Sequence, residues 1–301
     1  MNTGLVLALT AAVSFAVGIV LVRKTAGEAG EAFSVTALSV FTGIPLFAIA
    51  ITISGEWHNL IAISLKALVM LAATGVIHFI IGRLLAYDAF RLIGANRATP
   101  ITQVSPVFTV ILSWIFLSER LTLYVGLGAT CMMVGVFLVG WARAKAAIAA
   151  SKKRQADEVK GILMSLGAAL CWGITPILIK PAVEEAGSAA VGSFLSYSTA
   201  GIIMLFLLFL SRTRRQNFAR LSLKKNILPM AVAGLFTSAG QLMYFGALGK
   251  SPANIVAPLV TIEVLFIYAL SFLVNRKGEV FTAKVAFGMA ALVAGAFLLF
   301  R

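Results

Sequence analysis

Charged residues are scarce in this sequence. Only 12% of its 301 residues are charged, and just 11 of these are Asp or Glu. Apolar residues make up 60% of the chain and the mean hydropathy is +0.99, more than the core of a water-soluble domain can bury. The composition therefore excludes an ordinary soluble domain.

Cysteine is also scarce, and so are the motifs of metal and nucleotide chemistry. Cys131 and Cys171 each lie within an apolar run, where a thiol is usually a small packing residue, and there is no second pair to form a disulfide framework or a metal site. The phosphate-binding pattern G-x-x-x-x-G-K-[ST] does not occur. We therefore expect no metal, no cofactor and no ATP hydrolysis by this chain.

Long apolar runs fill the rest of the sequence. Most have roughly 18 to 25 residues, the length with which a helix crosses about 30 Å of hydrocarbon. Gly4 to Val22 has no basic residue before it and no cleavage signature after it, so we expect a first span rather than a signal peptide. The sequence predicts an all-α integral membrane protein with ten transmembrane helices, at residues 3–22, 33–54, 67–90, 95–117, 122–141, 160–179, 190–210, 227–248, 252–274 and 281–300.

The two halves of the sequence resemble each other. Gly4 to Gly30 align without a gap on Gly161 to Gly187, and Gly82, Asn96 and Pro100 fall on Gly240, Asn254 and Pro258. We predict one five-helix repeat at 1–143, a basic linker at 144–159 and a second repeat at 160–301. Because five is odd, the second repeat enters the membrane from the opposite side. Inverted repeats of this kind are typical of transporters.

The net charge of +14 follows the predicted topology. Of the 25 Lys and Arg residues, 19 lie in the five loops that would face one side of the membrane. Cytoplasmic loops carry such an excess, so we predict a multi-pass protein of the cytoplasmic (inner) membrane with both termini outside. We expect the lipid bilayer, and not nucleic acid, to be the partner of this charge.

Several short motifs accompany this organisation. They are Asn96-x-x-x-Pro100 and Asn254-x-x-x-Pro258 opening spans 4 and 9, Ser118-Glu119-Arg120-Leu121-Thr122 after span 4, Trp172 in span 6, and Gly278-Glu279 after span 9. With two five-span repeats, they make the whole chain resemble the EamA-type transporters of the drug/metabolite transporter superfamily. The resemblance implies a central cavity lined by spans 1, 3, 4, 6, 8 and 9 and transport of small metabolites such as amino acids.

The chain departs from the family pattern in two places. Span 1 has Phe15 where span 6 has Trp172, and the second loop is two residues longer. Neither departure points to a substrate.

Three ionisable residues lie deep within the predicted spans, where a charge is costly. Glu263 is the carboxylate at such depth, and because burial disfavours its charged form it is a candidate for proton coupling, with neutralisation by a partner such as Arg83 as the alternative. Arg83 is a candidate anchor for a substrate carboxylate or phosphate. His78 shares a face with Thr74, Gly75 and Gly82, which favours a packing role.

Neutral polar residues and prolines complete the set of candidates. Side chains suited to line a substrate cavity are Tyr87, Gln103, Trp172, Gln241 and Tyr244, with hydrogen bonds that join helices as the alternative role for the last four. Pro100, Pro106, Pro176 and Pro258 interrupt helical hydrogen bonding and are candidate hinges, with static bends as the alternative. The pairs Cys131/Gly135 and Ala291/Gly295 are small enough for close helix packing.

These features favour a secondary active transporter of a small polar metabolite, with an exporter implied by the resemblance. The partners would be a small-molecule substrate, the bilayer and a proton as coupling ion. Alternatives are transport of phosphorylated or other anionic metabolites, a channel or receptor-like component, and a membrane enzyme acting on lipid-linked substrates. An enzyme would need several converging acids or histidines, which the spans do not supply.

Overall fold

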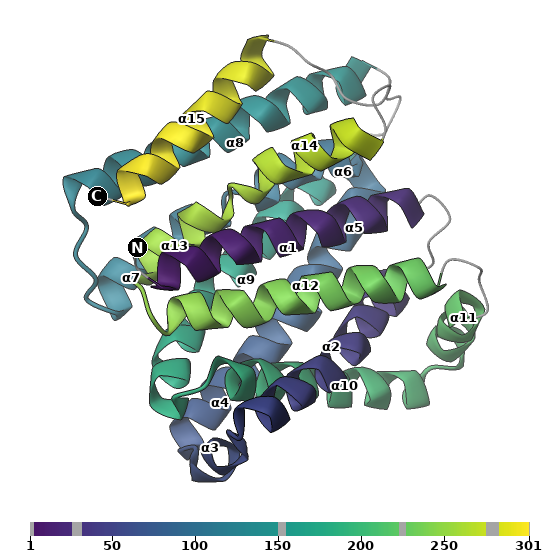
Figure 1. The fold of residues 1–301 in the computed structure, drawn as a ribbon. Helices are drawn as coiled ribbons and strands as arrows, with labels where there is room; N and C mark the ends of the chain where they lie inside the picture. Colours follow the sequence, from purple (N-terminus) through teal and green to yellow (C-terminus); the bar gives the residue numbers. More distant parts are fainter. Residues whose placement is uncertain (1–2, 26–31, 150–154, 223–226, 275–282, 301) are drawn as a thin grey trace. The chain divides into compact units, whose positions relative to one another are not determined.

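The computed structural model describes residues 3–25, 32–149, 155–222, 227–274 and 283–300, and every regular element in these ranges is a helix (Figure 1). The all-α architecture is therefore confirmed. The elements are α1 (Thr3–Thr25), α2 (Ala32–Ser54), α3 (Trp57–Ala62), α4 (Leu65–Thr74), the π-helix η2 (Gly75–Gly82), α5 (Arg83–Ile93), α6 (Ala95–Thr102), α7 (Ser105–Phe116), α8 (Leu123–Ala149), α9 (Gln155–Ala186), α10 (Ala189–Leu210), α11 (Arg212–Ser222), α12 (Ile227–Leu248), α13 (Ala253–Val260), α14 (Glu263–Val274) and α15 (Ala283–Leu299).

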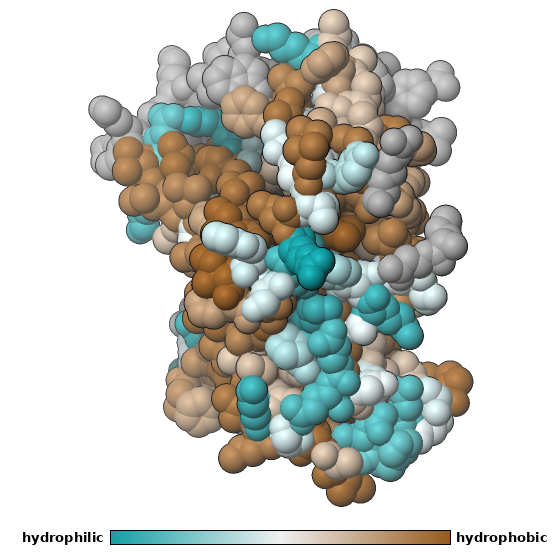
Figure 2. Space-filling model, turned by 90° about the vertical axis from the view of Figure 1, so that its left-hand side faces the viewer, coloured by the Kyte–Doolittle hydropathy of each residue, from teal (hydrophilic) through white to brown (hydrophobic). Residues whose placement is uncertain are grey.

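Nine helical stretches of the described chain are long and apolar enough to cross a membrane. The predicted tenth span coincides with α15, which is apolar but has 17 residues, so the count of ten stays a prediction. Large apolar side chains such as Ile53, Ile61 and Phe209 are 83%, 88% and 77% exposed. Apolar residues also cover much of the face drawn in Figure 2, as expected for a surface in contact with lipid tails.

The described chain divides into two compact units that do not follow the two halves of the sequence. Unit 1 contains Met1–Ile80 and Leu178–Lys250, and unit 2 contains Ile81–Ile177 and Ser251–Arg301. Each unit thus takes helices from both predicted repeats. Helices α8 and α9 also extend into the predicted linker at 144–159, and the repeat boundaries themselves stay a prediction.

Unit 1 is built from three close helix pairs, in which α1 packs on α12 and α2 packs on both α10 and α12. Small residues bring the backbones together, because a Cβ on Gly18 would lie 3.1 Å from the Ala233 carbonyl oxygen. An aromatic cluster fills the space beside α2, where the Tyr197 ring lies 4.7 Å from Phe47 and 4.3 Å from Phe79 between centroids. These contacts fix η2 against α10.

In unit 2, α8 and α15 pack closely against each other and lie side by side (Figure 1). A Cβ on Gly135 would lie 2.6 Å from the carbonyl oxygen of Gly288, and one on Gly295 would lie 2.7 Å from that of Gly128. The expected close packing is therefore confirmed at Gly135 and Gly295, because only glycine allows backbones to approach so closely. The rest of unit 2 packs α13 on α7 and α8, and α6 on α5 and α8.

Candidate functional site

Two predicted spans are interrupted at corresponding places in the two halves of the chain. Span 4 is divided into α6 and α7 at Gln103 and Val104, and span 9 into α13 and α14 at Thr261 and Ile262. At these breaks the backbone forms tighter bonds to the third preceding residue, from Val104 to Ile101 (3.2 Å) and from Ile262 to Leu259 (3.2 Å). Interrupted helices in matching positions are the feature around which many transporters build their binding sites.

Prolines lie close to both breaks. Pro100 and Pro258 lie inside the last turn of α6 and α13, where each removes a backbone donor and clashes with the preceding turn. Pro106 lies in the first turn of α7, a position that a proline accepts readily. Pro176, by contrast, lies within the continuous helix α9. The hinge role of all four stays a prediction.

A side-chain hydrogen bond connects the two breaks within unit 2. The Nε2 of Gln103 donates to the Oε1 of Glu263 at 2.7 Å. Both side chains are half-buried, and Glu263 lies in the first turn of α14, where the partial positive charge of a helix N-terminus favours a carboxylate. The amide holds the carboxylate in one position while leaving it further acceptor capacity for a proton or a ligand donor.

Arg83 and Tyr87 lie one turn apart on α5, also in unit 2. Arg83 is only 8% exposed, and Tyr87 is close enough to interact electrostatically with it. A guanidinium held away from water keeps its charge and presents several donors in a fixed plane. The structure thus shows that the Arg83 side chain is buried, whereas its role in binding a substrate stays a prediction.

His78 and Gln241 form a second polar pair, in unit 1. The Nε2 atoms of His78 and Gln241 lie 3.1 Å apart, and His78 belongs to the π-helix η2. Gln241 is 4% exposed, and its amide oxygen has no hydrogen-bond partner among the residues that the structure describes. The hydrogen bond is consistent with the packing role expected for His78. Tyr244, one turn further along α12, is buried as well.

Trp172 lies against Gly82 in unit 2. A Cβ on Gly82 would lie 2.7 Å from the indole Nε1, so the absence of a side chain is what lets the ring approach η2. The corresponding residues of the other repeat, Phe15 and Gly240, meet in the same way in unit 1, with 2.6 Å from a Gly240 Cβ to the Phe15 ring. The aromatic residues of spans 1 and 6 therefore share a packing role despite their different types.

The structure thus distributes the predicted residues over both units. Unit 2 holds Arg83, Tyr87, Gln103, Trp172 and Glu263, and unit 1 holds His78, Gln241 and Tyr244. Within unit 2, Gln103 bonds to Glu263, and within unit 1, His78 pairs with Gln241. Their common membership of a substrate cavity stays a prediction.

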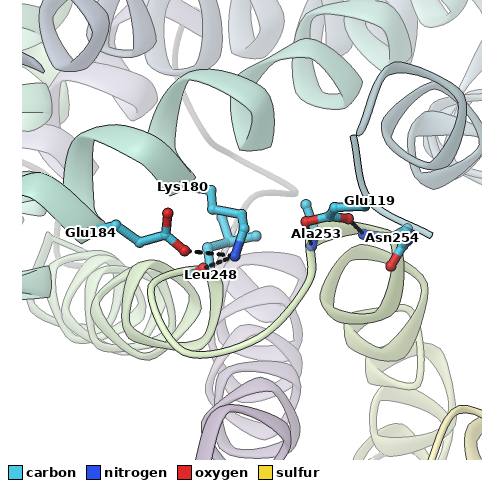
Figure 3. A network of polar contacts seen from close by, with 6 residues as sticks. All are labelled: Glu119, Lys180, Glu184, Leu248, Ala253 and Asn254. Atoms are coloured by element: carbon cyan, nitrogen blue, oxygen red, sulfur yellow. Dashed lines mark hydrogen bonds and ion pairs between the residues drawn. The ribbon is translucent and has the colours of Figure 1, made fainter. Parts of the chain in front are cut away.

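Glu119 caps a helix of unit 2, a role that was not predicted from the sequence (Figure 3). Its two carboxylate oxygens accept from the backbone N–H groups of Ala253 (2.7 Å) and Asn254 (2.9 Å) at the start of α13. The Asn254 side chain donates to the carbonyl of Arg120 at 3.2 Å. Pro252, the residue before α13, has no side-chain acceptor of its own. Glu119, which follows the end of α7, therefore acts as the N-terminal cap of α13. The feature of the sequence that could have pointed to Glu119 is its place in the Ser118–Thr122 motif.

Lys180 likewise stabilises a helix end in unit 1, and this role was not predicted from the sequence either (Figure 3). Its Nζ donates to the Leu248 carbonyl at 3.4 Å, at the C-terminus of α12, and to Glu184 at 2.7 Å. A cation stabilises the partial negative charge of a helix C-terminus. The end of α12 and the start of α13 are thus each stabilised by a side chain of suitable charge.

The two similar halves of the chain have counterparts among known proteins. The sequence profile of the EamA-like transporter family matches residues 2–141 and 159–301. The chain belongs to this family. The EamA resemblance inferred from the motifs is therefore confirmed, and the protein is a multi-pass membrane transporter.

Relatives of this EamA-family protein carry no more specific description. An uncharacterized protein of Methanocaldococcus jannaschii is 30% identical over 139 residues, which are 46% of this chain and 97% of that protein. An uncharacterized transporter of Archaeoglobus fulgidus is 23% identical over 218 residues, 72% of this chain and 71% of that one. One crystal structure matches over 98% of this chain and 95% of its own, with a TM-score of 0.72 and 15% identity, and supports the fold.

Proposed function

We propose that this EamA-family protein is a secondary active transporter that exports small polar metabolites such as amino acids by alternating access. The observation that carries the proposal is the Gln103–Glu263 hydrogen bond, which joins the breaks of α6/α7 and α13/α14. A helix break frees backbone carbonyls and N–H groups, and such groups bind polar substrates or ions at the centre of a membrane.

The proposed roles divide between a cation and a carboxylate. Arg83 binds the carboxylate of the substrate, because a buried guanidinium forms paired, charge-assisted hydrogen bonds with it. Glu263 carries the coupling proton, since a carboxylate held by Gln103 inside the membrane can alternate between a neutral and a charged form. Tyr87 and Trp172, which belong to the same unit as Arg83 and Glu263, would shape the remainder of the binding site.

The test is transport by the purified protein in liposomes with an imposed pH gradient. Glu263→Gln keeps a hydrogen-bonding group beside Gln103 but cannot bind a proton, so we expect transport driven by the gradient to be lost while exchange without a gradient remains. Glu184→Gln is the matched control, because this carboxylate pairs with Lys180 and its side chain is 47% exposed. Unchanged gradient dependence in Glu263→Gln would remove Glu263 from the coupling step.

Transport of a phosphorylated metabolite is the second candidate, and the buried Arg83 favours it. Arginine binds phosphate as well as carboxylate, with the same paired geometry. Counterflow experiments distinguish the two candidates, because only the true substrate class preloaded on one side accelerates entry of its labelled analogue. Acceleration by sugar phosphates and not by amino acids would favour this second candidate.

A further inference from the structure

Helix α11 is the basic connecting helix of unit 1, between α10 and α12. It packs against the end of α10 and the start of α2. The Phe218 ring meets Phe41 edge-on at 6.0 Å between centroids, and the Arg214 guanidinium lies 4.8 Å above the Phe33 ring. With Leu221 only 2% exposed, these contacts hold one face of the short helix firmly against the bundle.

The opposite face of α11 is exposed and strongly basic. Its sequence, RTRRQNFARLS, contains four arginines and no acidic residue. Arg212, Arg215 and Arg220 are exposed, whereas Arg214 is partly covered through its contact with Phe33. At about 100° per residue Arg212 and Arg220 fall on the side away from Phe218 and Leu221, and Arg215 lies at the edge of that side, about 60° from Phe218. The helix is therefore amphipathic, with its cations directed outward.

Helix α3 provides an internal comparison, because it connects the second and third spans of the first repeat as α11 does in the second. It follows the end of α2, and Glu56 just before it accepts a hydrogen bond from Ser188, the N-cap of α10. Helix α11 follows the end of α10 and contacts the start of α2. Since α2 has 23 residues, the two connecting helices lie at opposite ends of it, about 35 Å apart.

The two connecting helices differ in charge, as loops on the two sides of a membrane do. Helix α3, with the sequence WHNLIA, contains no Lys, Arg, Asp or Glu. Its Trp57 packs edge-on against Phe194 at 6.1 Å between centroids, an aromatic anchor of the kind common at membrane interfaces. Of these two connecting helices, α11 therefore carries a cluster of cations and α3 carries none.

We propose that the exposed face of α11, formed by Arg212, Arg215 and Arg220, binds the headgroups of anionic phospholipids. The contacts with Phe33 and Phe41 fix the helix at the rim of the spans, where headgroup phosphates lie within reach of long arginine side chains. Guanidinium groups bind phosphate through paired hydrogen bonds, and clusters of cations beside a span attract anionic lipid. This lipid site is distinct from the transported substrate and does not depend on its identity.

The experiment measures lipid retained by the detergent-purified protein in native mass spectrometry, with phosphatidylglycerol and phosphatidylcholine offered at equal concentration. The variant is Arg212→Gln/Arg215→Gln/Arg220→Gln. Each basic residue near a membrane surface contributes about a fivefold gain in affinity for anionic lipid, so we expect phosphatidylglycerol binding to fall by up to roughly 100-fold. Phosphatidylcholine binding should stay unchanged.

Two controls separate a specific surface from a general effect of charge or folding. The triple lysine variant at the same positions should keep most of the phosphatidylglycerol binding, which a folding defect would not allow. The variant Arg91→Gln/Lys160→Gln/Lys284→Gln removes three exposed basic residues of unit 2 and should change binding far less. Equal losses in the two glutamine variants, or no loss in the α11 variant, would overturn the proposal.

Discussion

At the scale of single residues, two pairs of polar side chains within the spans are joined by hydrogen bonds between helices. Gln103 holds Glu263 and Gln241 pairs with His78, each within one compact unit. A polar group in hydrocarbon without such a partner costs several kcal/mol by order of magnitude, so these pairs are fixed parts of the structure. Arg83 differs from them in carrying a permanent charge.

Replacement of Arg83 tests whether that charge serves a substrate. In Arg83→Leu we expect the affinity for an acidic substrate to fall by roughly 10- to 100-fold, because a charge-assisted hydrogen bond contributes about 1.5–3 kcal/mol. The amide of the same substrate should lose much less. Competition assays on the transporter in liposomes measure both values. Equal losses for acid and amide would assign Arg83 a purely structural role.

At the scale of helices, the interruptions were partly predictable and the π-helix was not. Pro100, Pro106 and Pro258 mark the breaks of α6/α7 and α13/α14, since proline removes a backbone donor wherever it occurs. The η2 sequence GVIHFIIG, however, is as apolar as an ordinary span and carries no local signal for a wider turn. Its contacts with α10, such as Phe79 on Tyr197, arise only in the folded bundle.

The same reasoning explains why contacts between particular residues could not be predicted from the sequence. Both Gln103 and Glu263 were identified as candidates, but their hydrogen bond joins positions 160 residues apart. No role was predicted for the Glu119 and Lys180 side chains, because each residue lies near the end of a span, where charged residues are common. Only the packing of α13 beside α7, and of α9 beside the end of α12, turns these two charges into helix caps.

Gly82 tests the close approach of α9 to η2. In Gly82→Ala the new Cβ would lie 2.7 Å from the Trp172 Nε1 and 3.2 Å from the Cys171 Cβ, so the two helices must shift. We expect a stability loss of about 1–3 kcal/mol, seen as a lower melting temperature of the purified protein. Gly126→Ala on α8 is the control, because nothing lies within 4 Å of its Cβ. Equal melting temperatures for the two variants would contradict the packing.

Glu119 tests the cap of α13. Glu119→Ala removes both acceptors at the start of that helix and leaves the N–H groups of Ala253 and Asn254 without them. We expect a loss of about 0.5–2 kcal/mol, the usual effect of removing a helix cap. Thermal unfolding measures it, with Glu184→Ala, whose side chain is 47% exposed, as the matched carboxylate control. A loss in Glu119→Ala no greater than that in the control would mean that the cap contributes little.

At the scale of the whole molecule, duplication and packing follow different divisions of the chain. The family profile matches residues 2–141 and 159–301, whereas the compact units combine segments from both halves. Sequence periodicity reveals the first division, because related residues keep their spacing after duplication. The second depends on which helices pack together, and a list of apolar runs does not contain that information.

The orientation in the membrane is the remaining property of the whole molecule, and α3 and α11 give a direct test of it. In a variant without Cys131 and Cys171, single cysteines replace His58 on α3 or Gln216 on α11, both exposed positions at opposite ends of unit 1. With both termini outside, a membrane-impermeant thiol reagent should label the His58→Cys protein in intact cells, and the Gln216→Cys protein only after the membrane is opened. The reason is that the basic connecting helix should face the cytoplasm. Labelling in the reverse order would invert the predicted topology and would place the α11 arginines at the outer surface, whereas labelling of both in intact cells would contradict the separation of the two helices by the spans.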